Sequence, residues 1–191
     1  MAWPEGFSGG IAHRLDLPTS GAVWVAADPE ELARMRALFA GGQLQKTYRF
    51  VAARGVPWED NRIERPIAHA RGRKSRMVVQ RGASTPHRGK WYPARTSLRR
   101  VSGDLWSAVI ETGVMHQIRV HAAFVGLPLA GDRLYGGGDP PEQAPAGVSF
   151  LLHHIGLEGG GMRTDPVEAP SWVSGGSTPI PGPRSGAHPL R

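Results

Sequence analysis

The chain has 191 residues, of which 40% are hydrophobic and 20% charged, and its formal net charge is +7. That length suits one domain with a sizeable core, and the absence of cysteine excludes a disulfide scaffold, a thiolate zinc site and a cysteine nucleophile. The opening residues lack the features of a secretion signal, and no apolar run reaches the roughly 18–20 residues of a membrane span. We therefore expect a cytoplasmic protein with no membrane partner.

The positive charge is concentrated in one part of the chain. Residues 62–100 contain ten arginines and two lysines but a single acid, Glu64, so the rest of the chain is net acidic. A solvated face ordinarily mixes both signs of charge. Arginine also suits bidentate phosphate contacts and stacking on bases, so the segment predicts a nucleic-acid partner.

The first predicted elements are a strand and a helix. Residues 22–27 form a short apolar run of strand length. Asp28 is a typical N-cap, Pro29 suits the first helical position, and Glu31 completes a capping box. Two glycines at 41–42 end the helix, whose apolar residues recur at helical spacing and predict a buried stripe.

The remaining elements are mostly strands. Alternating or apolar segments predict strands at 46–54, 76–80, 94–101, 104–111 and 150–157, and residues 116–125 predict a second helix. This pattern indicates an α+β fold: a mixed, largely antiparallel sheet with flanking helices. We assign residues 1–173 to this domain and expect the Gly/Pro-rich tail 174–191 to be disordered.

Three motifs that could carry other chemistry fail on spacing. Residues 82–90 look like a phosphate-binding loop, but six residues separate the glycines where four are required. His116 and His121 lie on different faces of the predicted helix, so we expect no metal site there. Ser20 lacks the glycine two positions before it that a nucleophile elbow needs.

One polar constellation remains. Residues 13–21 read HRLDLPTSG and place Asp16 in a polar turn, where an aspartate by itself is ordinarily a turn-former. The segment nevertheless resembles the signature of the RluA-type pseudouridine synthases, in which HRLD is followed after two residues by TSG. Further resemblances follow in the family's order along residues 10–173: Lys46-Thr47-Tyr48, RIERPI at 62–67, Arg76-Met77, Ala94-Arg95-Thr96, Thr112-Gly113, HQIRVH at 116–121, Gly131-Asp132, Tyr135-Gly136 and 152–157.

The resemblance implies that the chain isomerises uridine to pseudouridine in rRNA or tRNA, as a monomer and without a metal or other cofactor. Asp16 would be the catalytic carboxylate, attacking the ribose C1′ or the uracil C6. Tyr48 would pack against the base and is a candidate to take the C5 proton, and Arg119 would pair with Asp16. The expected RNA contacts are His13, Arg14, Arg73, Lys74, Arg76, His116 and Gln117.

Two features depart from the family pattern. Val114 stands where the family usually has an arginine, and only 12 residues precede His13, where the family carries a further strand. An uncovered sheet edge there would favour self-association. These departures motivate an alternative, a catalytically impaired RNA-binding protein on the same fold, although intact Asp16, Tyr48 and Arg119 argue against it. A DNA-binding regulator is disfavoured because no helix-turn-helix pattern is seen.

Overall fold

The computed structural model describes residues 7–72, 75–142, 144–164 and 169–173. Two of the expected RNA contacts, Arg73 and Lys74, lie outside the described residues, as does the tail 174–191. No helix in the described part of the chain is long and apolar enough to cross a bilayer.

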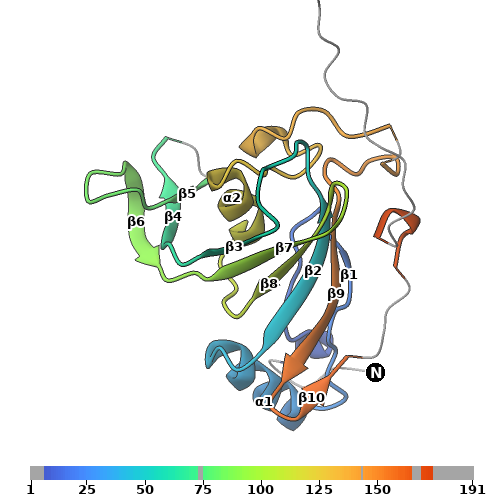
Figure 1. Ribbon diagram of the computed structural model, residues 1–191. Helices are drawn as coiled ribbons and strands as arrows, with labels where there is room; N and C mark the ends of the chain where they lie inside the picture. Colours follow the sequence, from blue (N-terminus) through green and yellow to red (C-terminus); the bar gives the residue numbers. More distant parts are fainter. Residues whose placement is uncertain (1–6, 73–74, 143, 165–168, 174–191) are drawn as a thin grey trace, which may run out of the picture.

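A mixed sheet forms the centre of the molecule (Figure 1). Its strand order is β1-β9-β2-β8-β7-β3, with β10 paired to β9. All of these neighbours are antiparallel except β1 and β9, which run parallel. The strands are β1 (Ser20–Gly21), β2 (Gln45–Val51), β3 (Asp60–Ile63), β7 (Thr96–Ser102), β8 (Leu105–Ile110), β9 (Leu152–Gly159) and β10 (Met162–Arg163).

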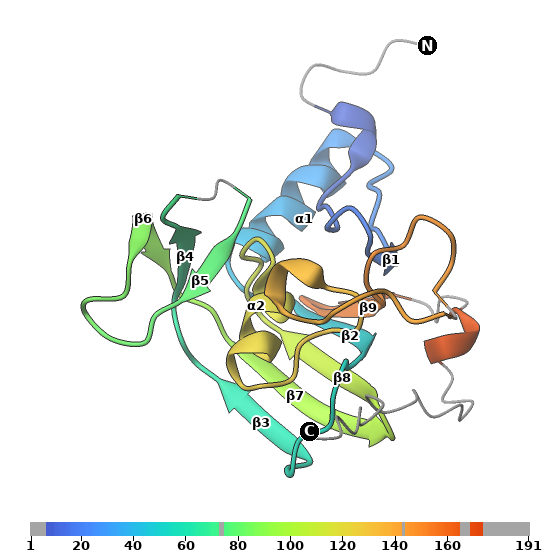
Figure 2. The same ribbon diagram turned by 90° about the horizontal axis from the view of Figure 1, so that it is seen from above.

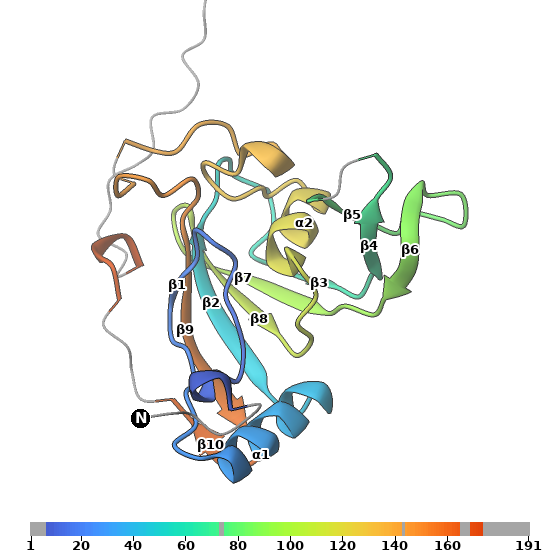
Figure 3. The same cartoon turned by 180° about the vertical axis from the view of Figure 1, so that it is seen from behind.

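A second, smaller sheet forms a lobe beside the main one. Its order is β5-β4-β6, from β4 (Ile67–Ala70), β5 (Met77–Val79) and β6 (His87–Tyr92), and it stands next to α2 (Gln117–Phe124) in Figure 3. Buried residues of the lobe pack with Val120 of α2 and with Tyr135, which lies in a 3₁₀ turn (Arg133–Tyr135). The lobe and α2 therefore share one small core.

The two helices lie at different places on the main sheet. Figure 2 shows α2 lying over one face of the sheet, while α1 (Pro29–Ala40) lies at one end of it. The start of α1 is as predicted: the Asp28 side chain accepts a hydrogen bond from the Glu31 amide at 2.8 Å. The Glu31 carboxylate accepts from Ala27, one residue before the expected partner.

The predicted α+β fold with a largely antiparallel sheet is confirmed, and both predicted helices are present. Strands predicted at 46–54, 76–80, 94–101, 104–111 and 150–157 correspond to β2, β5, β7, β8 and β9. The strand predicted at 22–27 is wrong: parallel pairing with β9 ends at Gly21, and Val25 makes only an isolated bridge to Ile11. Strands β1, β3, β4, β6 and β10 were not predicted, because they are short and mostly lack clear apolar alternation.

Candidate active site

A cavity of about 920 Å³ lies where the loop 12–19 meets the end of α1, strand β2 and the start of α2. In Figure 3, the segments on either side of β1 run alongside β2 and β9. The three predicted catalytic residues, Asp16, Tyr48 and Arg119, all line this cavity. Segments more than 100 residues apart in sequence thus meet at one site.

Two carboxylates share the Arg119 guanidinium. Asp132 binds it through two hydrogen bonds, 2.6 Å from Nε to Oδ2 and 2.9 Å from Nη2 to Oδ1. The Oδ2 of Asp16 lies 3.6 Å from Nη1, a single and longer contact. The Asp132 side chain is 1% exposed and that of Asp16 is 29% exposed. Arg119 is thus held mainly by Asp132, and the Asp16 carboxylate stays accessible from the cavity.

The surroundings of Arg119 keep it charged. Burial acts to lower its pKa, but the hydrogen bonds and charge of Asp132, followed by Asp16 and Tyr135, raise it overall. Its guanidinium carbon also lies 4.3 Å from the centre of the Phe150 ring and 5.1 Å from that of Tyr135. The pair with Asp16 was predicted, but no role was predicted for Asp132.

His13 supports the loop that carries Asp16. Its Nε2 accepts a hydrogen bond from the Trp24 amide at 3.1 Å, and its ring lies 4.9 Å from the Phe39 ring. Burial, followed by the nearby His154 and Lys46, lowers the pKa of His13 to about 4. A neutral ring whose Nε2 is already an acceptor fits a role in positioning the loop better than the expected RNA contact.

Tyr48 lies on β2 with its ring stacked on His154, the centres 4.5 Å apart. Burial and then the Asp16 carboxylate raise the pKa of Tyr48, so its phenol is neutral. His154 donates from Nδ1 to the Ala22 carbonyl at 2.6 Å, which ties this stack to the chain beyond β1. The aromatic wall of the cavity is therefore held from two strands of the sheet.

Lys46, for which the resemblance implied no role, also lines the cavity. It is 7% exposed, and burial lowers its pKa to about 8. Its Nζ lies 5.5 Å from the centre of the Phe39 ring and has no ion pair with any described carboxylate. The residue adds a cation to the cavity wall, which favours an anionic ligand.

Gln117 does not fit its expected contact with RNA. Its Oε1 accepts from the Thr112 hydroxyl and the Val114 amide at 2.8 and 3.1 Å. Its Nε2 donates to the Arg95 carbonyl and the Thr96 hydroxyl at 2.8 and 3.2 Å. All four hydrogen-bonding positions of the amide are thus used within the protein. Gln117 fixes the turn before α2, where Val114 packs against the core of the lobe.

His116 lines the cavity just before α2 with an unusual backbone. Its φ is 55°, a value that a residue other than glycine seldom adopts without a constraint. Its Nδ1 lies 3.0 Å from the Tyr135 hydroxyl, which also accepts a hydrogen bond from the Met77 amide at 2.9 Å. This network joins the cavity to β5, and it was not predicted.

The remaining expected contacts divide between two places. Arg14 is exposed and lines the cavity. Arg76 is exposed but lies over the Tyr135 ring in a neighbouring pocket, away from Asp16. Across the described ranges, no group of three His, Cys, Asp or Glu residues is arranged to hold a metal ion.

Comparison with known proteins identifies the family. The family model described as RNA pseudouridylate synthase matches residues 4–124, and the chain belongs to this family. The resemblance to RluA-type enzymes is thereby confirmed.

Curated relatives agree with this assignment. The chain is 37% identical over 133 residues to chloroplastic RNA pseudouridine synthase 2 of Oryza sativa, covering 67% of this chain and 29% of that protein. It is 33% identical over 146 residues to ribosomal large subunit pseudouridine synthase D of Yersinia pestis, covering 74% and 42%. The chain therefore spans less than half the length of these relatives.

A solved structure shows the same fold. Human RNA pseudouridylate synthase domain containing 1 superimposes with a TM-score of 0.66 at 25% identity, covering 84% of this chain and 68% of the human one.

Proposed function

We propose that the chain isomerises uridine to pseudouridine in rRNA or tRNA, with Asp16 as the nucleophile. The observation that carries the proposal is the division of roles around Arg119. Asp132 neutralises the guanidinium through two short bonds, while Asp16 touches it once, at 3.6 Å, and faces the cavity. A carboxylate near a cation, but not locked by it, can still move to attack.

The proposed reaction is the one that the family resemblance implies for Asp16. The Asp16 carboxylate attacks C1′ of the ribose or C6 of the uracil, and the N1–C1′ bond breaks. The uracil turns and its C5 bonds to C1′, while the bond between Asp16 and the nucleotide breaks and restores the free carboxylate. The C5 proton leaves and N1 gains a proton. Nothing is oxidised or reduced and no phosphate is transferred, so the proposed reaction requires neither a metal nor a redox cofactor.

Tyr48 packs against the uracil and takes the C5 proton late in the reaction. In the free protein, burial and the Asp16 carboxylate keep its pKa high. The phenol therefore holds a proton in the free protein, and Tyr48 must pass that proton on, towards solvent or N1, as it takes the one from C5.

The target uridine must leave the RNA stack to reach Asp16. Extrusion of a base costs a few kcal/mol, which backbone contacts and stacking in the protein offset. The cavity volume of about 920 Å³ is large enough for a whole nucleotide, and Arg14 and Lys46 supply cations at its wall. The monomeric state and the location in the cytoplasm stay predictions.

Tritium release tests the proposal directly. Unmodified rRNA and tRNA transcripts carrying tritium at uridine C5 are incubated with the wild type and with Asp16→Asn. We expect release by the wild type only, with RNA affinity of the variant within a few-fold, because the substitution removes the nucleophile and one negative charge. Substantial release by Asp16→Asn would refute the mechanism. Salt-sensitive RNA binding by the wild type without any release would favour the alternative of a binding protein that lacks turnover.

A further inference from the structure

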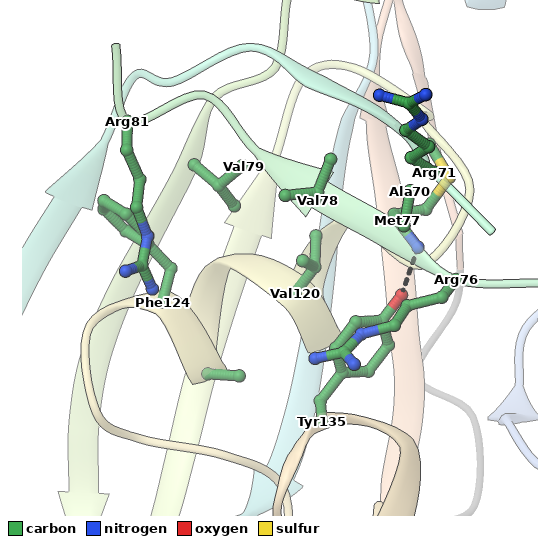
Figure 4. A pocket seen from close by; sticks show the side chains of 11 residues that line it. Ala70, Arg71, Arg76, Met77, Val78, Val79, Arg81, Val120, Phe124 and Tyr135 are labelled. Atoms are coloured by element: carbon green, nitrogen blue, oxygen red, sulfur yellow. Dashed lines mark hydrogen bonds between the residues drawn. The ribbon is translucent and has the colours of Figure 1, made fainter. Parts of the chain in front are cut away.

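A second pocket, of about 350 Å³, lies between β5 and α2 (Figure 4). Val78 and Val79 of β5 and Val120 and Phe124 of α2 supply apolar walls, and Tyr135 closes one end. Its volume lies within the range of roughly 300–1,000 Å³ found for small-ligand sites. The pocket is thus large enough for one planar, largely apolar group.

The edges of this pocket are positively charged. Arg71, Arg76 and Arg81 line it together with no acidic residue, and none of the three forms an ion pair within the described part of the chain. In Figure 4, Arg81 lies beside Phe124 at one end and Arg76 beside Tyr135 at the other. Their guanidinium carbons lie 5.7 and 5.8 Å from the centres of those rings. An apolar surface with a guanidinium group at each end fits a base whose neighbouring phosphates lie at those ends.

The pocket is separate from the cavity of Asp16 but touches it. The two share no lining residue. They are joined by the contact between the Nδ1 of His116, which lines the cavity, and the hydroxyl of Tyr135, which lines the pocket, at 3.0 Å. One RNA strand can therefore reach both places at once.

We propose that this pocket binds a second unpaired nucleotide of the same RNA, distinct from the target uridine. The base lies on the apolar floor against Phe124, and the three arginines contact its phosphates. Bases splayed from RNA stack on aromatic and guanidinium planes, and arginine binds phosphate bidentately. The inference rests on the proposed function only in taking RNA as the ligand.

Filling the pocket without changing its charge tests the proposal. Val78→Trp places a large ring on the half-buried floor, and Val101→Trp places the same ring on β7, where Val101 is 46% exposed. Affinity is measured with unmodified rRNA and tRNA transcripts, after a thermal melt confirms that both variants fold. We expect Val78→Trp to weaken RNA binding at least about fivefold, which is the lower end of the loss of affinity found when one stacked base is removed. Val101→Trp should bind RNA as the wild type does.

A second pair of variants separates the pocket from a merely basic surface. Arg76→Gln combined with Arg81→Gln should reduce the salt dependence of binding, by about one unit of slope for each phosphate that is no longer bound. Arg99→Gln is the control, because it removes a cation from an exposed position of β7, on the face opposite the buried Thr96 and Leu98. Ultraviolet crosslinking should map RNA to a peptide containing Phe124. If the arginine pair weakens binding but Val78→Trp matches Val101→Trp, the proposal is overturned and the arginines form only a charged surface.

These measurements do not depend on turnover. Pocket-dependent binding without tritium release would retain the second nucleotide site and reject the proposed reaction. Tritium release by the wild type, with unchanged RNA affinity of Val78→Trp, would retain the proposed reaction and reject the second nucleotide site.

Discussion

Replacing Asp132 by asparagine should both destabilise the protein and slow its chemistry. The Asp132 side chain is 1% exposed and makes two hydrogen bonds to Arg119, whose own side chain is 8% exposed. Asp132→Asn keeps the shape but removes the charge that compensates the guanidinium. Among the described residues, Arg119 then keeps one ion-pair partner, Asp16, at 3.6 Å.

The size of both effects follows from this geometry. Removing one partner of a buried ion pair costs about 3–5 kcal/mol, and we expect the lower end, about 3 kcal/mol, because Asp16 remains nearby. In a chain of this length that corresponds to a fall in Tm of roughly 6–12 °C. Arg119 should also turn towards Asp16 and bind it. Attack must then break a charge-assisted hydrogen bond worth about 1.5–3 kcal/mol, which slows tritium release about ten- to hundredfold.

Thermal denaturation and tritium release measure the two effects, and Asp139→Asn is the matched control. Asp139 pairs with Arg133 at the surface, where the side chains are 80% and 74% exposed, so its removal should shift Tm by less than about 2 °C. If the cost arises from a stranded guanidinium, adding Arg119→Gln to Asp132→Asn should restore part of the stability. A Tm for Asp132→Asn equal to that of Asp139→Asn would refute the reasoning.

Two further predictions concern single groups. Tyr48→Phe should bind RNA within a few-fold of the wild type but release tritium at least about a hundredfold more slowly, since it keeps the packing and removes the proton acceptor; release at the wild-type rate would exclude that role. Burial lowers the pKa of His121 to about 4, and its Nδ1 accepts from the Thr96 hydroxyl. The unfolded chain therefore binds a proton first as pH falls below about 6.5, so His121 should contribute a loss of up to about 3 kcal/mol in the free energy of unfolding by pH 4. Urea denaturation of the wild type and His121→Gln at pH 7.5 and 5 measures that contribution, and equal pH dependence in the two proteins would contradict it.

The strands of the main sheet were predictable where one face alone is buried. Along β2 the residues alternate between buried and half-exposed, with Tyr48 and Phe50 on the buried face. The segment 22–27 misled because its apolar run has exposed valines at 23 and 25. There the Trp24 amide donates its hydrogen bond to the His13 side chain and not to the backbone of a neighbouring strand.

Of the three strands of the lobe, only β5 was predicted, and β4 and β6 were missed for a related reason. Strand β6 reads HRGKWY, where four polar or glycine residues hide any alternation. Its partner β4 has four residues, and β5 has three. Such short segments are stabilised by pairing with one another and by packing on α2, which no local pattern records. The positive charge of residues 62–100 was evident from the sequence, but the pocket that some of their arginines line was not.

The candidate site shows which parts of a proposed mechanism can be predicted from sequence motifs. Motifs sufficed to predict that Asp16, Tyr48 and Arg119 belong to one site, because each is an identifiable residue type at a fixed place in a motif. The division of Arg119 between two carboxylates depends on where a 3₁₀ turn places Asp132 relative to α2, and spacing does not determine that. Had Asp16 alone held the guanidinium through two bonds, the proposed nucleophile would have been immobilised by its own ion-pair partner. Asp132 removes this conflict, because it takes the strong bonds and leaves Asp16 the weak one.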